Sequence, residues 1–428
     1  MINIEKIPIL RGEISVSGDK SISHRAVMIS SIAKGDSLIR NFLEGEDCEA
    51  TISAFRNMGI SVDSETGGNI IVKGKGLRGL SQPADSLYLG NSGTSMRLLL
   101  GILAGQDFKA VLKGDPSLST RPMKRVTQPL MLMGAEVEGA DNANFAPITI
   151  YGRSLKAISY KSPIASAQVK SSIIFAGLYA KGRTTVTEPY KSRDHTERML
   201  TFFGADIKEE GLSVSIEGLG NKEFGPRDMD IPADISSAAF FIALATIAKD
   251  ARICIKRCGI NSTRTGIISV LRDMGADIEF VNKAGDFEPI ADIVVRSSAL
   301  KATRVLKGQV PSLIDEIPLI ALCATQAEGV TLIDGIGELR VKETDRVNSI
   351  LTNLKAFGAD IEVEKDTFII KGPKKLQGAS IDSFGDHRSA MMGIITGCIA
   401  DNKTVVNNTN CIATSFPNFM DILKSLAR

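Results

Sequence analysis

The chain repeats one pattern six times, and this periodicity constrains its fold more than any single motif does. In each copy, polar, glycine-bearing or ionisable residues precede a run of small and aliphatic residues, which predicts the start of a helix. The first residues of the six starts lie 72, 75, 68, 81 and 71 residues apart. Such self-similarity defines the architecture before any one motif is interpreted. The six positions are Asp19, Asn91, Ser166, Asp234, Asp315 and Asp386.

A second series of positions runs between these starts and ends an amphipathic segment in each interval. It consists of Met58-Gly59, Met133-Gly134, Phe203-Gly204, Met274-Gly275 and Phe357-Gly358. After each glycine, apolar and polar residues alternate along the chain, which predicts strands. The order within a unit is therefore helix, strand, helix and a two-stranded hairpin. In the first unit we expect helices over 21–33 and 48–58, and strands over 37–40, 60–62 and 69–72.

The two ends of the chain indicate how the six units are divided. The sixth unit stops inside its second helix, at 419–426, and lacks the strands that follow in the other units. We expect strands over 2–9 and 13–16 to complete the half that contains the C-terminus. Three units per half give one lobe of 20–235 and a discontinuous lobe of 1–19 plus 236–428, with a hinge near 19–20 and 234–236. An uninterrupted ring or solenoid of six units is the alternative.

The composition excludes several classes of partner. The 428 residues include 51 basic and 49 acidic ones, so no overall field recruits nucleic acid, although a local basic site can still bind a small anion. The longest apolar run, Ala238–Ala248, is too short for a membrane span, and the polar start Met1–Lys6 does not resemble a signal peptide. Six scattered cysteines without a CxxC pair indicate buried, reduced thiols and hence a cytoplasmic protein.

Cations gather at the predicted helix starts of the first half. Lys20, Ser21 and Arg25 follow Asp19, and three cations lie within the five residues 121–125. A helix N-terminus offers unpaired N–H groups and a positive dipole end, which favour phosphate or carboxylate. The glycines of 90–94 allow a ligand to approach the backbone closely. For each string, the alternative is an ordinary helix start with solvated cations. Pro122 itself fits the first position of a helix.

Two further helix starts complete the first half. Ser166, Ala167 and Gln168 either cap the apolar helix that follows or bind a ligand. Asp194 is typical of an N-cap, and Arg193 just outside it can contact a ligand.

The second half adds carboxylates to such starts. Asp315 precedes an apolar helix, where an acid either complements the helix dipole or takes part in chemistry. Lys342, Glu343 and Arg346 fall within about one turn, which is typical of an ion clamp with a proton carrier or of a surface cluster of ion pairs. Arg388 belongs to the last start. The three histidines have no helical HxxxH spacing, which argues against a metal site.

Taken together, these strings resemble the enolpyruvyl transferases, and within them the enzymes that act on shikimate 3-phosphate. The resemblance spans essentially the whole chain, and the strings take the form of the second of two broad sequence classes. It implies an α/β fold of two lobes, each an inverse α/β barrel of three βαβαββ units, that close over the substrates. The matching strings are Gly18–Arg25, Gly90–Arg97, Arg121–Met123, Ser166–Gln168, Ser192–His195, Leu313–Pro318, Arg340–Arg346 and Gly385–Arg388.

The implied reaction moves the enolpyruvyl group of phosphoenolpyruvate onto the 5-hydroxyl of shikimate 3-phosphate and releases phosphate. It requires no metal, nucleotide or covalent enzyme intermediate. The shikimate 3-phosphate ligands implied are Lys20, Ser21, Arg25, Ser166, Ala167, Gln168, Arg193, Asp315 and Lys342. The phosphoenolpyruvate ligands implied are Lys20, Gly93, Arg121, Gln168, Arg346 and Arg388. The catalytic residues implied are Asp315, Glu343 and Lys20.

The sequence departs from the family pattern at Ser415, where many members carry a lysine that contacts phosphoenolpyruvate. Lys342, Arg346 or Arg388 must therefore supply the positive charge. Gly93 stands where a larger residue would crowd the phosphoenolpyruvate pocket, which favours sensitivity to glyphosate, the inhibitor of the family.

Two alternatives compete with this interpretation. The sister transferase that acts on UDP-N-acetylglucosamine uses a cysteine ahead of its Arg-Pro, and residues 114–121 contain none. A non-catalytic phosphosugar-binding protein would gain nothing from carboxylates such as Asp315 and Glu343 facing its ligand. We expect two small-molecule substrates, no nucleic-acid or membrane partner, and a monomer.

Overall fold

The structure of the chain is a computed structural model, and it describes residues 1–427. The chain forms two compact units. The middle unit is Gly18–Ile231, and the terminal unit combines Met1–Ser17 with the chain from Pro232 onward. The chain therefore passes between the units at 17–18 and at 231–232, while the hinge expected near these crossings stays a prediction.

The middle unit contains three sheets of four strands each. The strands are β3 (Lys34–Arg40), β4 (Ser61–Glu65), β5 (Asn69–Lys75), β6 (Leu87–Tyr88), β7 (Lys109–Lys113), β8 (Glu136–Gly139), β9 (Phe145–Tyr151), β10 (Ser159–Lys161), β11 (Arg183–Thr187), β12 (Ile207–Glu210), β13 (Ser213–Glu217) and β14 (Met229–Asp230). The sheet orders are β14-β3-β5-β4, β6-β7-β9-β8 and β10-β11-β13-β12. In each sheet a short edge strand runs parallel to its neighbour, and the other pairs are antiparallel.

The terminal unit repeats this plan in two sheets of four strands and one of three. Its strands are β1 (Ile2–Ile4), β2 (Leu10–Ile14), β15 (Ala251–Gly259), β16 (Asp277–Gly285), β17 (Pro289–Arg296), β18 (Arg304–Val305), β19 (Gly329–Asp334), β20 (Asp360–Glu364), β21 (Thr367–Gly372), β22 (Ser380–Asp382) and β23 (Thr404–Asn407). The sheet orders are β16-β17-β15-β2, β18-β19-β21-β20 and β1-β23-β22.

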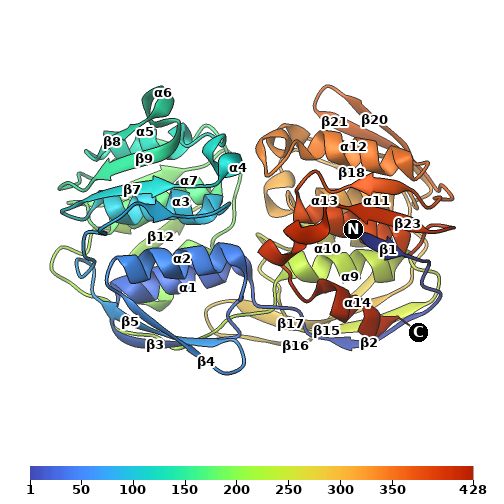
Figure 1. Cartoon of the computed structure of the whole chain (residues 1–428), viewed down its shortest axis with the longest axis horizontal. Coiled ribbons are helices and arrows are strands. Elements are labelled where there is room, and N and C mark those ends of the chain that lie inside the picture. The colour runs from blue at the N-terminus through green and yellow to red at the C-terminus, as the bar shows by residue number, and fades with distance from the viewer. Residues whose placement is uncertain (428) are drawn as a thin grey trace. The chain divides into compact units, whose positions relative to one another are not determined.

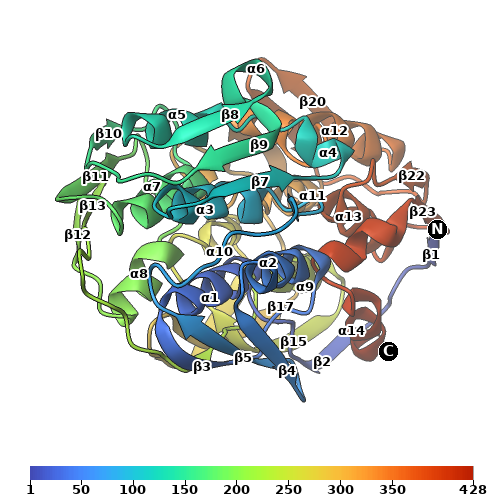
Figure 2. The same ribbon diagram turned by 60° about the vertical axis from the view of Figure 1, so that its left-hand side comes forward.

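One helix of each repeat is buried on nearly all sides, because most of its residues are small or aliphatic. These helices are α1 (Lys20–Ile32), α3 (Gly93–Ala104) and α7 (Ala167–Gly177) in the middle unit, and α9 (Ile235–Ile247), α11 (Ile317–Ala324) and α13 (His387–Gly397) in the terminal unit. In each unit, Figures 1 and 2 show these helices inside and the sheets outside. All six predicted helix starts and the inverse α/β barrel are confirmed.

A second, half-buried helix follows in every repeat. These helices are α2 (Glu46–Asn57), α5 (Lys124–Leu132), α8 (His195–Phe202), α10 (Gly266–Asp273), α12 (Arg346–Ala356) and α14 (Phe419–Leu426). Five of them end where the second sequence series predicts. The glycine after each has a φ between 86° and 102°, a left-handed conformation that glycine adopts without strain. Short elements are α4 (Pro116–Ser119), α6 (Ala140–Ala143) and the 3₁₀ turns η1 (Val310–Ser312), η2 (Ile336–Val341) and η3 (Thr409–Thr414).

The start of the chain completes the terminal unit, as predicted, but in two places. β1 pairs antiparallel with β23 in the sheet of the sixth repeat, whereas β2 pairs parallel with β15 in the sheet of the fourth. In the middle unit, β14 pairs with β3 in the same way. Each unit is therefore closed on itself by the strand that precedes a crossing, which an uninterrupted ring of six units would not require.

Two expectations about membrane and thiol chemistry can be compared with the structure. Among residues 1–427, none of the helices combines the length and the apolar character that crossing a bilayer requires. Cys48, Cys258, Cys323 and Cys398 are buried, whereas Cys254 and Cys411 are only partly buried. The prediction of six buried thiols is therefore wrong for these two, which lie on the interior strand β15 and in the short 3₁₀ turn η3.

Candidate active site

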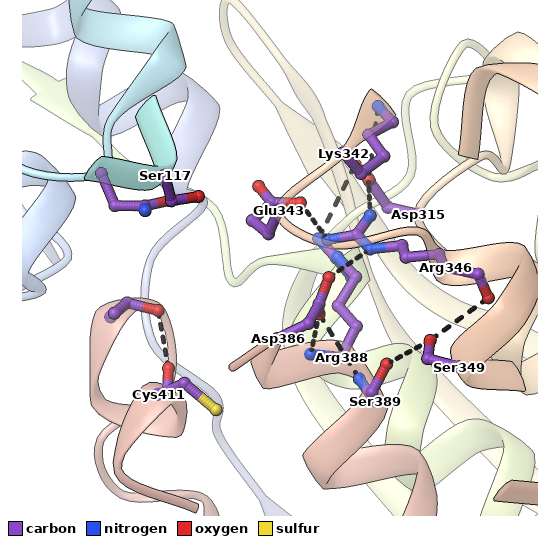
Figure 3. Close-up of polar contacts among 12 residues, drawn as sticks. Ser117, Asp315, Lys342, Glu343, Arg346, Ser349, Asp386, Arg388, Ser389 and Cys411 are labelled. Carbon is purple, nitrogen blue, oxygen red and sulfur yellow. Dashed lines mark hydrogen bonds and ion pairs between the residues drawn. The ribbon is translucent and has the colours of Figure 1, made fainter. Parts of the chain in front are cut away.

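A buried arginine gathers three carboxylates in the terminal unit (Figure 3). Arg346 is the first residue of α12 and is 1% exposed. Its guanidinium lies 3.1 Å from Asp315, 2.5 Å from Glu343 and 2.6 Å from Asp386. Burial alone would lower the pKa of Arg346, but Asp386, Glu343 and Asp315 together raise it above its ordinary value. The arginine therefore stays charged, and three segments that precede helices are held around it.

Two further cations lie beside the same carboxylates. Lys342 Nζ is 4.0 Å from Asp315 Oδ1, and Arg388 Nη2 is 3.7 Å from Asp315 Oδ2. The structure therefore brings together all five residues that the sequence predicts in this unit: Asp315, Lys342, Glu343, Arg346 and Arg388. Asp315 touches all three cations of the group, and a substrate anion that binds here must compete with carboxylates already in place.

Sequence reasoning missed two buried acids of this group. Asp386 was predicted only as the first residue of a helix start; its Oδ1 accepts from the Arg388 N–H at 2.7 Å, and its Oδ2 also binds Arg346. Glu316 accepts a hydrogen bond from Ser236 Oγ at 2.5 Å, and Arg264 donates to the same hydroxyl at 2.8 Å. Only tertiary placement distinguishes these acids from ordinary acids at helix starts.

A second group forms in the middle unit around the start of α3. Arg97 donates to Gln168 Oε1 at 2.7 Å and to the Pro122 carbonyl at 3.1 Å. Arg121, 7% exposed, donates to Asn91 and lies close to the position of Gly93. A Cβ at Gly93 would lie 2.9 Å from Arg97 Nη1 and 3.4 Å from Arg121 Nη1. The predicted residues Gly93, Arg121 and Gln168 are thus neighbours, and Arg97 connects them.

A series of hydrogen-bonded hydroxyl groups connects the start of α3 to α2 and α1. Ser92 caps the helix, Ser95 donates to Ser92 at 2.7 Å, and Thr51 lies 2.6 Å from Ser95. His24 Nδ1 lies 2.7 Å from Thr51, and burial lowers the pKa of His24 to about 3. The imidazole is therefore neutral at physiological pH and acts as a hydrogen-bonding group. This fixes the glycine-bearing loop before α3.

The cations of α1 are also oriented by neighbours. Lys20 Nζ lies 3.0 Å from Asp47, and Arg25, 3% exposed, donates to Thr196 at 2.7 Å and to Ser171 at 2.9 Å. Arg25 also donates to the Ser21 carbonyl at 2.9 Å. The guanidinium of Arg25 is thereby held between α1, α7 and α8. Ser171 and Thr196 were not predicted, because a hydroxyl residue in a helix gives no sequence signal.

The remaining predicted residues lie where the helices begin, with two corrections. Ser166 caps α7 through the Val169 N–H, and Ala167 is its first residue. Asp194 precedes α8, but its side chain makes no capping bond and pairs with Arg198 at 3.1 Å. Pro122 lies before α5, which begins at Lys124, so its predicted position inside the helix is wrong. Arg193 lies in the loop before α8.

The comparisons with known proteins agree with these groups. Residues 4–423 match the family model described as EPSP synthase (3-phosphoshikimate 1-carboxyvinyltransferase). The chain belongs to the EPSP synthase family. Two relatives named 3-phosphoshikimate 1-carboxyvinyltransferase come from Bacillus licheniformis, 47% identical over 99% of this chain and 98% of the relative, and from Geotalea uraniireducens, 50% identical over 97% of each.

Solved structures agree with this membership. The EPSP synthase of Acinetobacter baumannii is 43% identical, with a TM-score of 0.88 over 99% of this chain and 98% of that one. The enolpyruvyl transferase NikO from Streptomyces tendae is 18% identical with a TM-score of 0.81 over 99% and 96%, which shows the shared fold. As an EPSP synthase family member, the protein is a transferase that moves the enolpyruvyl group of phosphoenolpyruvate to shikimate 3-phosphate, in aromatic amino acid biosynthesis. The UDP-N-acetylglucosamine and non-catalytic alternatives are thereby set aside.

Proposed function

We propose that the residues predicted from the sequence carry this reaction. Shikimate 3-phosphate is bound by Lys20, Ser21, Arg25, Ser166, Ala167, Gln168, Arg193, Asp315 and Lys342, and phosphoenolpyruvate by Lys20, Gly93, Arg121, Gln168, Arg346 and Arg388. Both substrates are anions, and guanidinium groups bind carboxylate and phosphate through paired hydrogen bonds. Arg346 and Arg388 supply this charge in the terminal unit without a lysine at position 415, where the buried Ser415 stands.

Two proton transfers are assigned to Asp315 and Glu343. As the 5-hydroxyl of shikimate 3-phosphate attacks C2 of phosphoenolpyruvate, its proton is taken by one carboxylate, while the other group delivers a proton to C3. The tetrahedral intermediate then loses phosphate as C3 returns its proton. Lys342, 4.0 Å from Asp315, and Lys20 favour the charged form of nearby carboxylates and neutralise the phosphate groups.

The observation that carries this proposal is the contact of Asp315 and Glu343 with one guanidinium, that of Arg346. A protein that only bound phosphosugars would not place two carboxylates on its main cation. We further propose that the protein acts in the cytoplasm as a monomer of 45.8 kDa, which light scattering after gel filtration tests.

Arg25→Ala is expected to weaken shikimate 3-phosphate binding by roughly 10- to 100-fold, because a lost charge-assisted hydrogen bond typically costs about 1.5–3 kcal/mol. Titration calorimetry gives the affinity, and phosphate release in the presence of both substrates gives the activity. Arg198→Ala is the matched control, since Arg198 is a more exposed arginine of α8 that pairs with Asp194. Equal affinities of Arg25→Ala and wild type would remove Arg25 from the site.

Gly93→Ala is expected to raise the KM for phosphoenolpyruvate by about 10-fold and to lower glyphosate affinity at least as much. The new Cβ would lie 2.9 Å from Arg97 Nη1, so the guanidinium of Arg97 must shift. Steady-state kinetics with each substrate varied in turn measure the effect. An unchanged KM for phosphoenolpyruvate would contradict the placement of this ligand beside Gly93.

A further inference from the structure

A completely buried lysine in α7 holds two buried glutamates. Lys170 is not exposed, and its ammonium lies 2.8 Å from Glu188 Oε2 and 2.8 Å from Glu197 Oε1. We call these three residues the Lys170 triad. Moving such charges out of water is costly, and buried ion pairs are often no more stable than apolar residues of the same volume. Stability alone therefore does not account for the triad, so its contacts with the surrounding backbone are informative.

Lys170 stays positively charged within the triad. Burial alone would lower the pKa of Lys170, but Glu197 and Glu188 raise it above its ordinary value. Burial raises the pKa of Glu197, and Lys170 opposes this effect.

Only one of the two glutamates reaches the backbone of the predicted ligand loops. Glu188 Oε1 accepts from the Ser166 N–H at 3.1 Å, and Glu188 Oε2 accepts from the Ser192 N–H at 3.4 Å. Lys170 Nζ donates to the Ser192 carbonyl at 3.4 Å. Both backbone polar groups of Ser192, the residue before Arg193, are therefore bound by the triad. Glu197, by contrast, is paired with Lys170.

We propose that Glu188, supported by Lys170, is a positioning residue for shikimate 3-phosphate: it fixes the Ser166 and Ser192 backbone and thereby the two ligand segments that begin at Ser166 and Arg193. This inference rests on the proposed function of Ser166 and Arg193. Glu188 does not touch the substrate itself. It connects Ser166 at the start of α7 to Ser192 in the loop before α8.

The two glutamates provide a matched pair of variants. Glu188→Gln and Glu197→Gln each replace one carboxyl group 2.8 Å from the same ammonium with an amide of the same shape. Only Glu188→Gln also affects the loops, because an amide has a single acceptor oxygen for two backbone N–H groups. We expect Glu188→Gln to raise the KM for shikimate 3-phosphate by about 10-fold, since small misplacements of binding groups have large effects. Glu197→Gln should change this KM by less than about 2-fold.

The experiment measures steady-state kinetics for both substrates, thermal unfolding, and amide exchange at Ser192. For Glu188→Gln we expect a melting temperature within about 4 °C of wild type, an almost unchanged KM for phosphoenolpyruvate, and faster Ser192 exchange. If Glu188→Gln does not fold, Glu188→Asp, which keeps the charge but is one methylene shorter, is measured with the same expectation.

Equal rises in KM for the two Gln variants would overturn the proposal, because charge balance alone would then explain them. An unchanged KM in Glu188→Gln would overturn it as well. Ser166→Ala and Arg193→Ala test the underlying assignment separately: if neither weakens shikimate 3-phosphate binding, the proposed ligands are wrong, whatever Glu188 does.

Discussion

Replacing Glu343 by glutamine is expected to lower kcat by about 10²–10⁴-fold, the contribution typical of a positioned acid or base. The glutamine has nearly the same shape and can still accept from Arg346, which Glu343 contacts at 2.5 Å. It cannot, however, carry a proton, and proton transfer is the role proposed for Glu343 together with Asp315. Phosphate release at saturating substrates gives kcat, and incorporation of solvent deuterium into the methylene group of phosphoenolpyruvate reports on the proton transfer itself.

The control for this variant is Glu338→Gln, which changes an exposed glutamate of η2 in the same stretch. It should leave kcat within about 2-fold of wild type. A Glu343→Gln enzyme with normal kcat but a raised KM for phosphoenolpyruvate would show that Glu343 only orients Arg346, and its assignment to proton transfer would then be wrong.

The second large effect is expected from Asp315→Asn, which should also lower kcat by about 10²–10⁴-fold. Asp315 lies 3.1 Å from Arg346, 3.7 Å from Arg388 and 4.0 Å from Lys342, so it is the carboxylate most surrounded by cations. Asparagine keeps a hydrogen-bond acceptor for these groups but cannot carry out either of the two proton transfers proposed for the pair Asp315 and Glu343. The substitution removes a negative charge beside three cations, so these cations can attract the anionic substrate more strongly. Affinity for shikimate 3-phosphate should therefore fall much less than kcat.

Asp345→Asn is the matched comparison, since Asp345 is adjacent to Arg346 in sequence but caps α12 and pairs with Arg340 at the surface. Asparagine is an equally good cap, so kcat should remain near wild type. If Asp315→Asn turns over as fast as Asp345→Asn while binding shikimate 3-phosphate normally, Asp315 is a ligand and not a proton carrier.

Much of this architecture could be predicted because helix ends have local signals. The polar residues at Asp19 and Asp386 and the glycine at Gly59 each satisfy backbone groups within a few residues, so their sequence neighbourhood is sufficient evidence. Equivalent helix starts also concentrate the candidate ligands, although their roles follow from the resemblance to the enolpyruvyl transferases. The bounds of the first repeat were within a few residues of those observed.

What could not be predicted depends on contacts between distant segments. Lys170 lies in a string that was read as a helix start, and nothing near it in sequence shows that Glu188 and Glu197 neutralise it inside the protein. Asp386 was predicted only as a helix start, a local feature that does not indicate its contact with Arg346. Likewise, no local pattern indicates that β2 joins the fourth repeat, because strand pairing is specified by the partner and by burial.

The strand pairing at the start of the chain has a consequence for synthesis on the ribosome. All strands of the middle unit have been made once residue 231 is reached, since β14 closes its first sheet. β1, by contrast, has no partner until β23 at 404–407 has been made. At a synthesis rate of about 5–20 residues per second, the first strand therefore stays unpaired for roughly 20–80 s. During this time its exposed backbone can pair with another chain or bind a chaperone.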